Sequence, residues 1–335
     1  MSEKNEIVLV AGADGFIGSC LVADLLRQGY TRIRAVGAKP FQQWNQRIPD
    51  VENIQLDLKD RENCENVARG VYQIFMLASV KGGSGFIEKH KAECMLSVLI
   101  STHMLMAAQK HNVQKYFYSS SASVYSITRQ TDLNGPGLRE EDAYPADAQD
   151  GYGWEKLFSE RMCRHFQEEY GLYTRIARYF NVYGPHETWF GGRENVTAAI
   201  CRKVIEAKLN GLSEIRVWGD GNQTRSYTYI DDCLKGTHLI MNSPILEPVN
   251  LGSTEVVTIN QLIDIVESIA GTKFKRAYDL RAPKGVNVRR SDNTLIKKML
   301  DWEPSISLRD GLEKTYRWIY DQYTAREKGG AAVDA

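Results

Sequence analysis

The sequence has no excess of charge of either sign. Its 335 residues contain 42 lysines and arginines and 42 aspartates and glutamates, so the formal net charge is zero. Binding to nucleic acid or to an anionic membrane surface generally relies on an excess of basic side chains. We therefore expect neither partner, although a local basic cluster still permits a small phosphate-bearing ligand.

Paired cysteines and long apolar runs are also missing. The six cysteines form no Cys-x-x-Cys pair and no short Cys/His spacing, so we expect no metal site and no disulfide framework. No apolar stretch approaches the roughly 18 residues that cross a bilayer. The start, MSEKNEIVLV, lacks the basic and long apolar regions of a signal peptide. These absences predict a cytoplasmic protein in a reducing compartment, without a membrane span.

The first half of the chain alternates short apolar runs with helical patterns. Strand–helix alternation with apolar strands is typical of a parallel sheet that is covered on both faces. The pattern predicts a Rossmann-type, doubly wound α/β sheet followed by a smaller α/β substrate domain. The expected strands are 7–11, 33–36, 54–56, 71–78, 115–119, 173–179, 215–217 and 248–252, and the expected helices are 17–28, 91–111, 152–170, 196–209, 259–270, 293–300 and 308–323.

The change of pattern after residue 183 suggests where the domains divide. We expect a cofactor-binding domain over residues 1–183, to which a segment at about 226–252 returns. Residues 184–225 and 253–325 would form the substrate domain. Residues 326–335 are small and polar, and we expect a flexible tail there.

A glycine-rich turn follows the first expected strand. Gly12, Gly15 and Gly18 form a Gly-x-x-Gly-x-x-Gly pattern between a strand and a helix. Such a pattern allows a tight turn, close approach of backbone to a pyrophosphate and close helix–strand packing. It predicts a dinucleotide site, which we expect to include Phe16, Ile17, Asp57, Leu58 and Leu77. By spacing alone, Asp57 is equally compatible with a surface turn.

One residue departs from the usual pattern of such sites. An acidic side chain at the end of the second strand normally holds the adenosine ribose, but Gly37 stands there. Either backbone and water hold the ribose, or Lys39 and Arg34 accept a 2′-phosphate. We expect NAD as the cofactor and keep NADP as the alternative.

A tyrosine and a lysine lie at positions i and i+4 of an expected helix, on one face. They are Tyr152 and Lys156. A cationic neighbour favours the phenolate and lets a tyrosine take a hydroxyl proton while hydride leaves the same carbon. Ser121, at the end of a serine-rich strand, is placed to orient that hydroxyl. The three form the predicted catalytic set.

Glycine turn, serine-rich strand end and Tyr/Lys helix together resemble the extended short-chain dehydrogenase/reductase family. Within it, the chain resembles the GDP-mannose 3,5-epimerases over about residues 6–322. The resemblance implies bound NAD, a nucleotide-sugar substrate and a homodimer. The matching stretches are GGSGFI at 82–87, PADAQDGYGWEK at 145–156, TWFGGRENVTAAICRK at 188–203, WGDGNQTRSYTYID at 218–231, PVNLG at 248–252 and RRSDN at 289–293.

The resemblance also implies substrate-binding roles. Arg225 and Arg289 would neutralise the nucleotide diphosphate, which suits two guanidinium groups, and Asn181 would meet the same group. The residues that the resemblance places at the sugar are Gly82, Gly83, Ser84 and Asn195.

Two residues depart from those epimerases. Their acid–base cysteine and lysine are replaced here by Ser123 and Asn195, neither of which titrates near neutral pH. Lys81 and His186 are candidate replacements as acid, base or sugar contact; an ordinary loop histidine is the more frequent role for His186.

We therefore predict an NAD-dependent epimerase of a GDP-linked hexose or heptose that works through a 4-keto intermediate. Oxidation at carbon 4 needs only Ser121, Tyr152, Lys156 and the cofactor, which favours 4-epimerisation. The alternatives are a 3,5-epimerase with a substituted acid–base pair and a C4 dehydrogenase/reductase. A non-catalytic nucleotide sensor is disfavoured because Tyr152 and Lys156 are both present.

Overall fold

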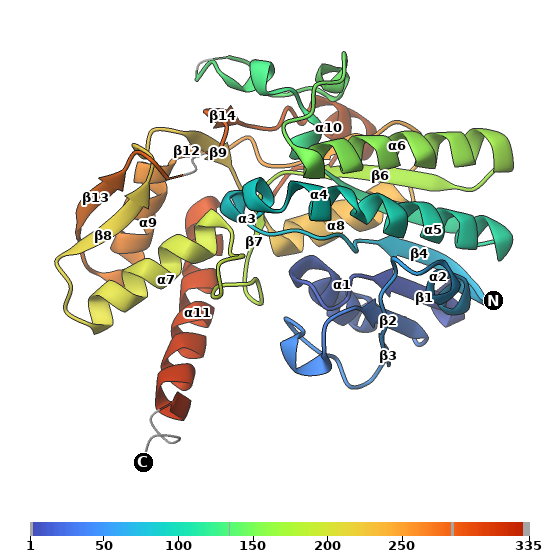
Figure 1. Cartoon of the computed structure of the whole chain (residues 1–335), viewed down its shortest axis with the longest axis horizontal. Coiled ribbons are helices and arrows are strands. Elements are labelled where there is room, and N and C mark those ends of the chain that lie inside the picture. The colour runs from blue at the N-terminus through green and yellow to red at the C-terminus, as the bar shows by residue number, and fades with distance from the viewer. Residues whose placement is uncertain (1–2, 134, 283–284, 331–335) are drawn as a thin grey trace.

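A seven-stranded, fully parallel sheet forms the centre of the molecule in the computed structural model, which describes residues 3–133, 135–282 and 285–330. The strand order β11-β6-β5-β4-β1-β2-β3 changes direction between β1 and β4 (Figure 1). The strands are β1 (Ile7–Ala11), β2 (Ile33–Gly37), β3 (Glu52–Gln55), β4 (Val71–Met76), β5 (Lys115–Ser121), β6 (Thr174–Tyr179) and β11 (Val249–Leu251).

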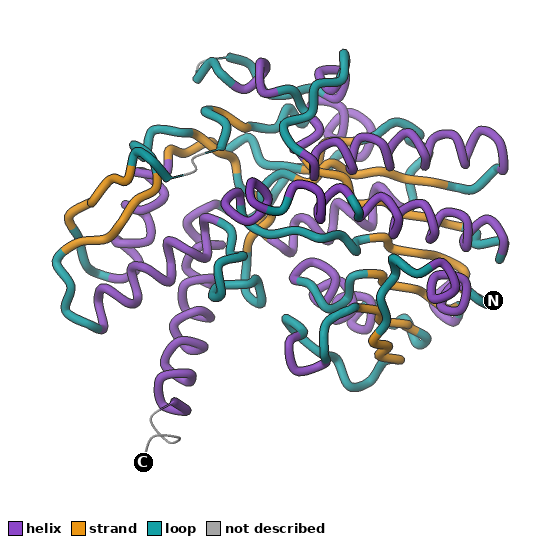
Figure 2. The backbone as a smooth tube through the Cα atoms, in the orientation of Figure 1, coloured by secondary structure: helices purple, strands orange, loops and turns teal. Residues whose placement is uncertain are grey.

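Helices cover both faces of this sheet (Figure 2). One face packs against α1 (Phe16–Arg27) and α8 (Ile230–Met241), and the other against α2 (Arg61–Ala68), α5 (Ser97–Lys110) and α6 (Gly151–Tyr170). Burial on both faces explains why the strands read as continuous apolar runs. The predicted Rossmann-type α/β fold is confirmed.

A smaller α/β part lies at the carboxyl edge of the sheet. It contains α7 (Val196–Leu209), α9 (Ile259–Ala270) and α11 (Leu308–Gly330), with α11 pointing away from the sheet (Figure 1). Its strands are β8 (Glu214–Trp218) with β13 (Lys275–Asp279), and β9 (Thr224–Ser226) between β12 (Val256–Thr258) and β14 (Val288–Arg289). The domain boundaries themselves stay a prediction.

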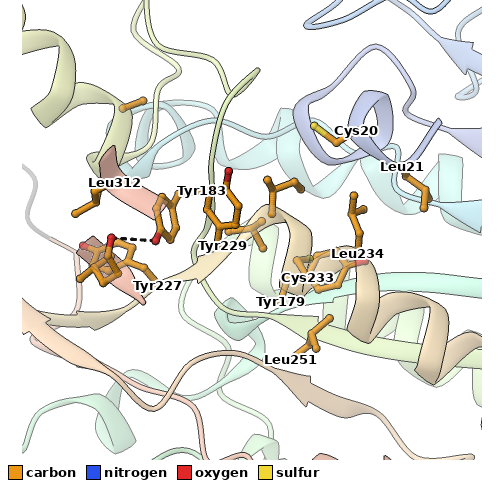
Figure 3. Packing of buried hydrophobic residues seen from close by; sticks show 14 of the residues in the cluster. Cys20, Leu21, Tyr179, Tyr183, Tyr227, Tyr229, Cys233, Leu234, Leu251 and Leu312 are labelled. Atoms are coloured by element: carbon orange, nitrogen blue, oxygen red, sulfur yellow. Dashed lines mark hydrogen bonds between the residues drawn. The ribbon is translucent and has the colours of Figure 1, made fainter. Parts of the chain in front are cut away.

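Aromatic packing joins this part to the sheet. Tyr183 packs edge-on against Tyr229, with ring centroids 5.6 Å apart, and the Tyr183 hydroxyl donates a hydrogen bond to the Leu308 carbonyl. Figure 3 shows these rings between Leu312 of α11 and Leu234 of α8. The short parallel pair β7 (Val182–Tyr183) and β10 (Thr228–Tyr229) supplies both tyrosines.

Several sequence predictions need correction. The single helix expected over 91–111 is two helices, α4 (Lys91–Met95) and α5; Ser97, at the start of α5, accepts a hydrogen bond from the Val80 N–H (2.8 Å) and ties the break to the loop after β4. Helix α8 is an unpredicted helix within the segment that returns to the sheet. The sequence predicts α10 (Thr294–Leu300) within one residue. It does not predict α3 (Ser84–Lys89) or the 3-10 turns at Glu3–Asn5, Phe41–Gln43, Ala122–Val124, Ile127–Gln130 and Glu140–Ala143.

The last helix is longer than the sequence predicts, and the flexible tail expected over 326–335 stays a prediction. Helix α11 continues through Gly330, beyond the expected end at Tyr323. The guanidinium of Arg326 lies over the ring of Phe190, 3.6 Å from its centroid, and this cation–π contact holds the added turn. Residues 331–335 lie outside the described residues. Among the residues that are described, no helix combines the length and apolar character needed to cross a membrane.

Candidate active site

The glycine turn after β1 (the glycine cradle) packs so closely against backbone that side chains at two of its glycines would collide with it. Gly12 has φ +88°, and a Cβ atom at this position would lie 2.7 Å from the Ala78 backbone nitrogen. A Cβ atom at Gly18 would lie 2.1 Å from the Gly12 carbonyl oxygen. Helix α1 begins at this turn, with Gly15 as its N-cap. Backbone N–H groups at the start of a helix suit the binding of a pyrophosphate.

The other predicted cofactor residues lie around this cradle. Phe16 and Ile17 open α1, and Leu77 follows β4, where its N–H donates to the Ala11 carbonyl (2.9 Å). Leu58 is buried, whereas Asp57 is exposed and accepts a hydrogen bond from the Lys59 N–H (2.9 Å). The residues at the ends of β1 and β4 thus fit a dinucleotide, while the carboxylate of Asp57 is used in its own turn.

The start of α6 packs directly on the end of β5. Gly153 makes this possible, because a Cβ atom there would lie 2.1 Å from the Ser123 carbonyl oxygen. Asp150 caps the helix by accepting from the Gly153 N–H (2.9 Å). This contact brings Tyr152 beside Ser121, whose hydrogen bond with the phenol opposes the rise in the pKa of Tyr152 described below.

Lys156 is buried on the same face of α6. Its Nζ lies 5.6 Å from the centroid of the Tyr152 ring and 4.8 Å from that of Tyr118. Its charge is balanced by Glu155, whose Oε2 lies 3.7 Å away. The other oxygen of Glu155 accepts hydrogen bonds from Ser101, Tyr118 and Ser159 at 3.0–3.1 Å.

Electrostatics in the chain by itself favour a neutral Tyr152. Burial, and then the negative charge of Glu155, raise the pKa of the phenol. Burial lowers the pKa of Lys156, and Glu155 opposes that shift. Proton abstraction by Tyr152 therefore depends on further positive charge near the phenol.

Arg225 and Arg289 meet on adjacent strands. They are register partners on β9 and β14, so their side chains leave the same face. Burial, and then the charge of Arg225, lower the pKa of Arg289 to about 9. Arg289 also donates to Gln130 (2.8 Å), Gln149 and, at 3.5 Å, to the Ser123 hydroxyl. The structure thus links the predicted diphosphate-binding arginines to the predicted sugar pocket.

The loop expected to contact the sugar lies against the loop before α7. The Gly83 N–H donates to the Arg193 carbonyl (3.1 Å), and a Cβ atom at Gly83 would lie 2.5 Å from the Glu194 carbonyl oxygen. This contact brings Gly82 and Gly83 close to Asn195, the N-cap of α7. Ser84 begins α3, directly after this loop.

Asn181 lies between β6 and β7 in a left-handed conformation (φ +39°). Its side-chain amide donates to the Ser226 carbonyl (2.8 Å), at the end of β9. Asn181 therefore connects the end of a central strand to the strand that carries Arg225.

A buried glutamate that sequence reasoning missed lies beneath the start of α7. Glu187 is 1% exposed; one carboxylate oxygen accepts from Thr197 (3.3 Å), and Oε2 has no hydrogen-bond partner among the described residues. Burial raises the pKa of Glu187 to about 8, while the Gly184 backbone, the Thr197 and Asn195 side chains and Lys81 oppose this rise.

Lys81 is an exposed residue whose charge interacts with that of Glu187. It remains accessible to solvent, yet desolvation and the charge of Lys156 lower the pKa of its ammonium, whereas Glu187 raises it. His186 differs, because its ring packs against Trp318 of α11 with centroids 5.2 Å apart. The structure thus brings Lys81 near the predicted catalytic lysine and gives His186 a packing partner.

A protein-family model matches the part of the chain that carries the predicted cofactor site and catalytic residues. The family model described as "NAD dependent epimerase/dehydratase family" matches residues 8–252, which include the cradle, Ser121, Tyr152 and Lys156. The chain belongs to this family. It is an NAD-dependent enzyme of the extended short-chain dehydrogenase/reductase type, as the sequence predicts.

Relatives of this chain can be aligned with almost its whole length. A GDP-mannose 3,5-epimerase of Arabidopsis thaliana is 38% identical over 98% of this chain and 86% of the relative. GDP-L-fucose synthase 1 of the same plant is 28% identical over 95% of this chain and 94% of the relative. Among solved structures, a UDP-glucose 4-epimerase from Thermotoga maritima with UDP-glucose has a TM-score of 0.84 at 25% identity, covering 95% of this chain and 99% of that one.

The sequence analysis names neither of two buried glutamates of this site, although the sequence carries a signal for one of them. Glu155 adjoins Lys156 in the Tyr-x-x-x-Lys pattern, and its burial follows from the helix face, so a helical projection identifies it. Glu187 lies in a Gly/Pro-containing loop, where no periodicity indicates which side chains turn inward. Its burial becomes visible only when α7 is in place.

Proposed function

We propose that this enzyme is an NAD-dependent epimerase of a GDP-linked hexose or heptose, which oxidises carbon 4 of the sugar to a ketone and inverts that carbon. The observation that carries the proposal is the convergence of Ser121, Tyr152 and Lys156 at the end of β5, two strands along the sheet from β1 and its glycine cradle. When bound in the cradle, oxidised nicotinamide supplies the hydride acceptor and a positive charge.

The chain's own residues handle the proton. Ser121 orients the C4 hydroxyl, and the phenol oxygen of Tyr152 takes its proton. The ammonium of Lys156, 5.6 Å from the ring of Tyr152, favours the phenolate together with the cofactor's charge. The same phenol returns the proton when hydride is given back to carbon 4, so the reaction is redox-neutral.

Recognition of the nucleotide is assigned to the arginine pair. Arg225 and Arg289 present two cations on one face, and a diphosphate provides the negative charge that relieves their repulsion. The guanine base is inferred from the names of the relatives, GDP-mannose 3,5-epimerase and GDP-L-fucose synthase. The implied sugar contacts are Gly82, Gly83, Ser84 and Asn195, and Asn181 is expected at the diphosphate.

Inversion at carbon 4 needs no second acid–base pair. The keto sugar must turn over so that hydride returns to its other face. Ser123 and Asn195, which stand where the resembling epimerases have a cysteine and a lysine, do not titrate near neutral pH. Their presence favours 4-epimerisation over proton transfer at carbons 3 and 5.

A specific observation supports a second candidate, epimerisation next to the keto group. Glu187 contacts the start of α7 with one unpartnered oxygen among the described residues, and its charge is coupled to that of Lys81. A carboxyl group with a pKa near 8 and an ammonium of lowered pKa are suitable for removing and returning protons near neutral pH. In this reading they substitute for the missing cysteine and lysine.

Deuterium uptake separates the two candidates. The protein is incubated with GDP-mannose, other GDP-hexoses and UDP-hexoses in deuterated water, and the products are identified by NMR. Inversion at carbon 4 without deuterium supports the first candidate. Deuterium at carbon 3 or 5 that disappears in Glu187→Gln supports the second. Failure to convert any of the sugars contradicts both.

We also propose that the enzyme is a cytoplasmic homodimer. Exposed apolar side chains gather on the neighbouring helices α4, α5 and α6, and such a patch is typical of an interface. They are Met95, Leu96, Leu99, Trp154 and Phe158, each at least 39% exposed. Light scattering of the wild type against Phe158→Glu tests this: a dimer in the first and a monomer in the second are expected.

A further inference from the structure

The end of β2 packs closely against the glycine turn that follows β1. A Cβ atom at Gly37 would lie 2.4 Å from the Cβ of Asp14 and 2.8 Å from its Oδ1. No side chain fits at position 37 while Asp14 is in place. The carboxylate of Asp14 therefore occupies the volume that an acidic residue at the end of β2 would fill.

Contacts with the next loop hold Asp14 in this orientation. Oδ2 accepts a hydrogen bond from the Lys39 N–H (3.2 Å), and the backbone carbonyl of Asp14 accepts from Lys39 Nζ (2.9 Å) and from the Asn45 N–H (3.3 Å). A carboxylate that pointed at the start of α1 would repel a pyrophosphate. Its turn toward β2 removes that conflict and leaves Oδ1 beside Gly37.

The basic residues that might favour a 2′-phosphate are already engaged. Arg34 donates to Glu52 (2.8 Å) and to the Val67 carbonyl (2.6 Å), on the side of β2 away from the turn. Lys39 Nζ is bound to the Asp14 carbonyl and, at 3.4 Å, to Asn45. Neither cation is therefore without a partner, and the carboxylate of Asp14 is the acidic group beside Gly37.

We propose that Asp14, in the glycine turn, takes the place of the missing acid at Gly37: its carboxylate accepts hydrogen bonds from the adenosine ribose hydroxyls and excludes the 2′-phosphate of NADP. In Rossmann folds an acidic group at the end of the second strand holds these hydroxyls. Here the acidic side chain is that of Asp14, which lies in the loop after β1 and is in contact with the end of β2. The inference rests on the NAD-dependent family and does not depend on which sugar is bound.

Binding of both nucleotides by calorimetry tests the proposal. The full chain, freed of copurified nucleotide, is titrated with NAD and with NADP as wild type, Asp14→Asn, Asp14→Gly, Gly37→Asp and the double variant Asp14→Gly/Gly37→Asp. Asp50→Asn, an exposed carboxylate before β3, is the control. Melting without nucleotide shows whether each variant folds.

Asp14→Asn should weaken NAD binding by roughly tenfold to a hundredfold, the usual effect of losing a charge-assisted hydrogen bond, and should reduce discrimination against NADP. Gly37→Asp alone should lose NAD binding because it collides with Asp14, and the double variant should recover the preference for NAD. Unchanged discrimination in Asp14→Asn, equal loss of both nucleotides, or a double variant that folds without recovering NAD preference would each overturn the proposal.

Discussion

Arg225 and Arg289 are direct register partners on the parallel strands β9 and β14, and their guanidinium groups leave the same face. Two cations in this arrangement repel each other, and the pKa of Arg289 falls to about 9 as a result of burial and this repulsion. The repulsion between the two guanidinium groups is unfavourable in the free enzyme, and a bound anion would reduce it. We regard it as the electrostatic basis of nucleotide-sugar binding.

Loss of Arg289 should affect substrate binding more than cofactor binding. In Arg289→Gln we expect the dissociation constant of a nucleoside diphosphate to rise roughly tenfold to a hundredfold, because one charge-assisted contact is lost, while the affinity for NAD stays within about twofold of wild type. Calorimetry with nucleoside diphosphate and with NAD checks both. Arg317→Gln, an exposed arginine of α11, is the control. Equal weakening of both ligands would contradict the assignment.

The same arginine predicts a pH dependence of binding. As pH rises through about 9, Arg289 loses its proton in the free enzyme. Affinity for a nucleoside diphosphate should therefore be constant from neutral pH to about 8 and fall above 9. Arg289→Gln should show a flat profile over this range. A wild-type affinity that does not change between pH 8 and 10 contradicts the lowered pKa.

Removal of the Tyr152 hydroxyl should stop oxidation of the sugar. We expect kcat of Tyr152→Phe to fall by about 10²–10⁴, the range that general acid–base groups contribute, with little change in binding. Tyr170→Phe, at the exposed end of the same helix, provides the matched control. Product formation followed by NMR is the measurement. Activity of Tyr152→Phe close to that of Tyr170→Phe would refute the proposed role.

Glu187 should make stability depend on pH. The folded protein holds its proton up to about pH 8, whereas the unfolded chain releases it near pH 4.5, so the unfolded state binds fewer protons in between. Stability is therefore lost as pH rises from about 4.5 to 8. Relative to wild type, Glu187→Gln should gain about 3–5 kcal/mol between pH 5 and pH 9. Urea unfolding at both pH values measures this, and parallel loss in the two proteins would show that Glu187 is not the source.

A buried ion pair should stabilise the end of β6. Arg178 and Glu160, both about 98% buried or more, are joined at 2.7 Å. Glu160→Gln leaves the guanidinium without its counter-charge and should lower the unfolding free energy by about 3–5 kcal/mol. Glu313→Gln, which breaks an exposed pair with Arg317 on α11, should change it by less than about 1 kcal/mol. Similar losses in chemical denaturation would contradict this distinction.

The sequence allows prediction of elements whose pattern is local. The strand Ile7–Ala11 and the helices Val196–Leu209 and Ile259–Ala270 are found with the expected limits, because apolar periodicity and flanking turn residues mark them. The short strands β9 and β14 have no such pattern, since three and two residues show no period. Their pairing, which aligns Arg225 with Arg289, depends on segments about 60 residues apart.

In the site, too, residues in a local sequence pattern could be predicted, whereas residues placed by packing between distant segments could not. Spacing alone places Tyr152 and Lys156 on one helix face, and the strand–turn–helix context identifies the glycine cradle. The overlap of Asp14 with the space beside Gly37 arises from packing between two loops, so the sequence shows only that the usual acid is missing. Burial of Glu187 likewise requires α7 above it.

The central claim is that hydride leaves carbon 4 of the sugar while Tyr152 takes the hydroxyl proton. It is tested most directly with a nucleotide sugar deuterated at carbon 4, in single turnover with the NAD-loaded enzyme. We predict a transient absorbance of reduced nicotinamide whose formation is slowed by deuterium, retention of the deuterium at carbon 4 of the product, and loss of the transient in Tyr152→Phe. Turnover without the transient, and with no isotope effect, would contradict the account.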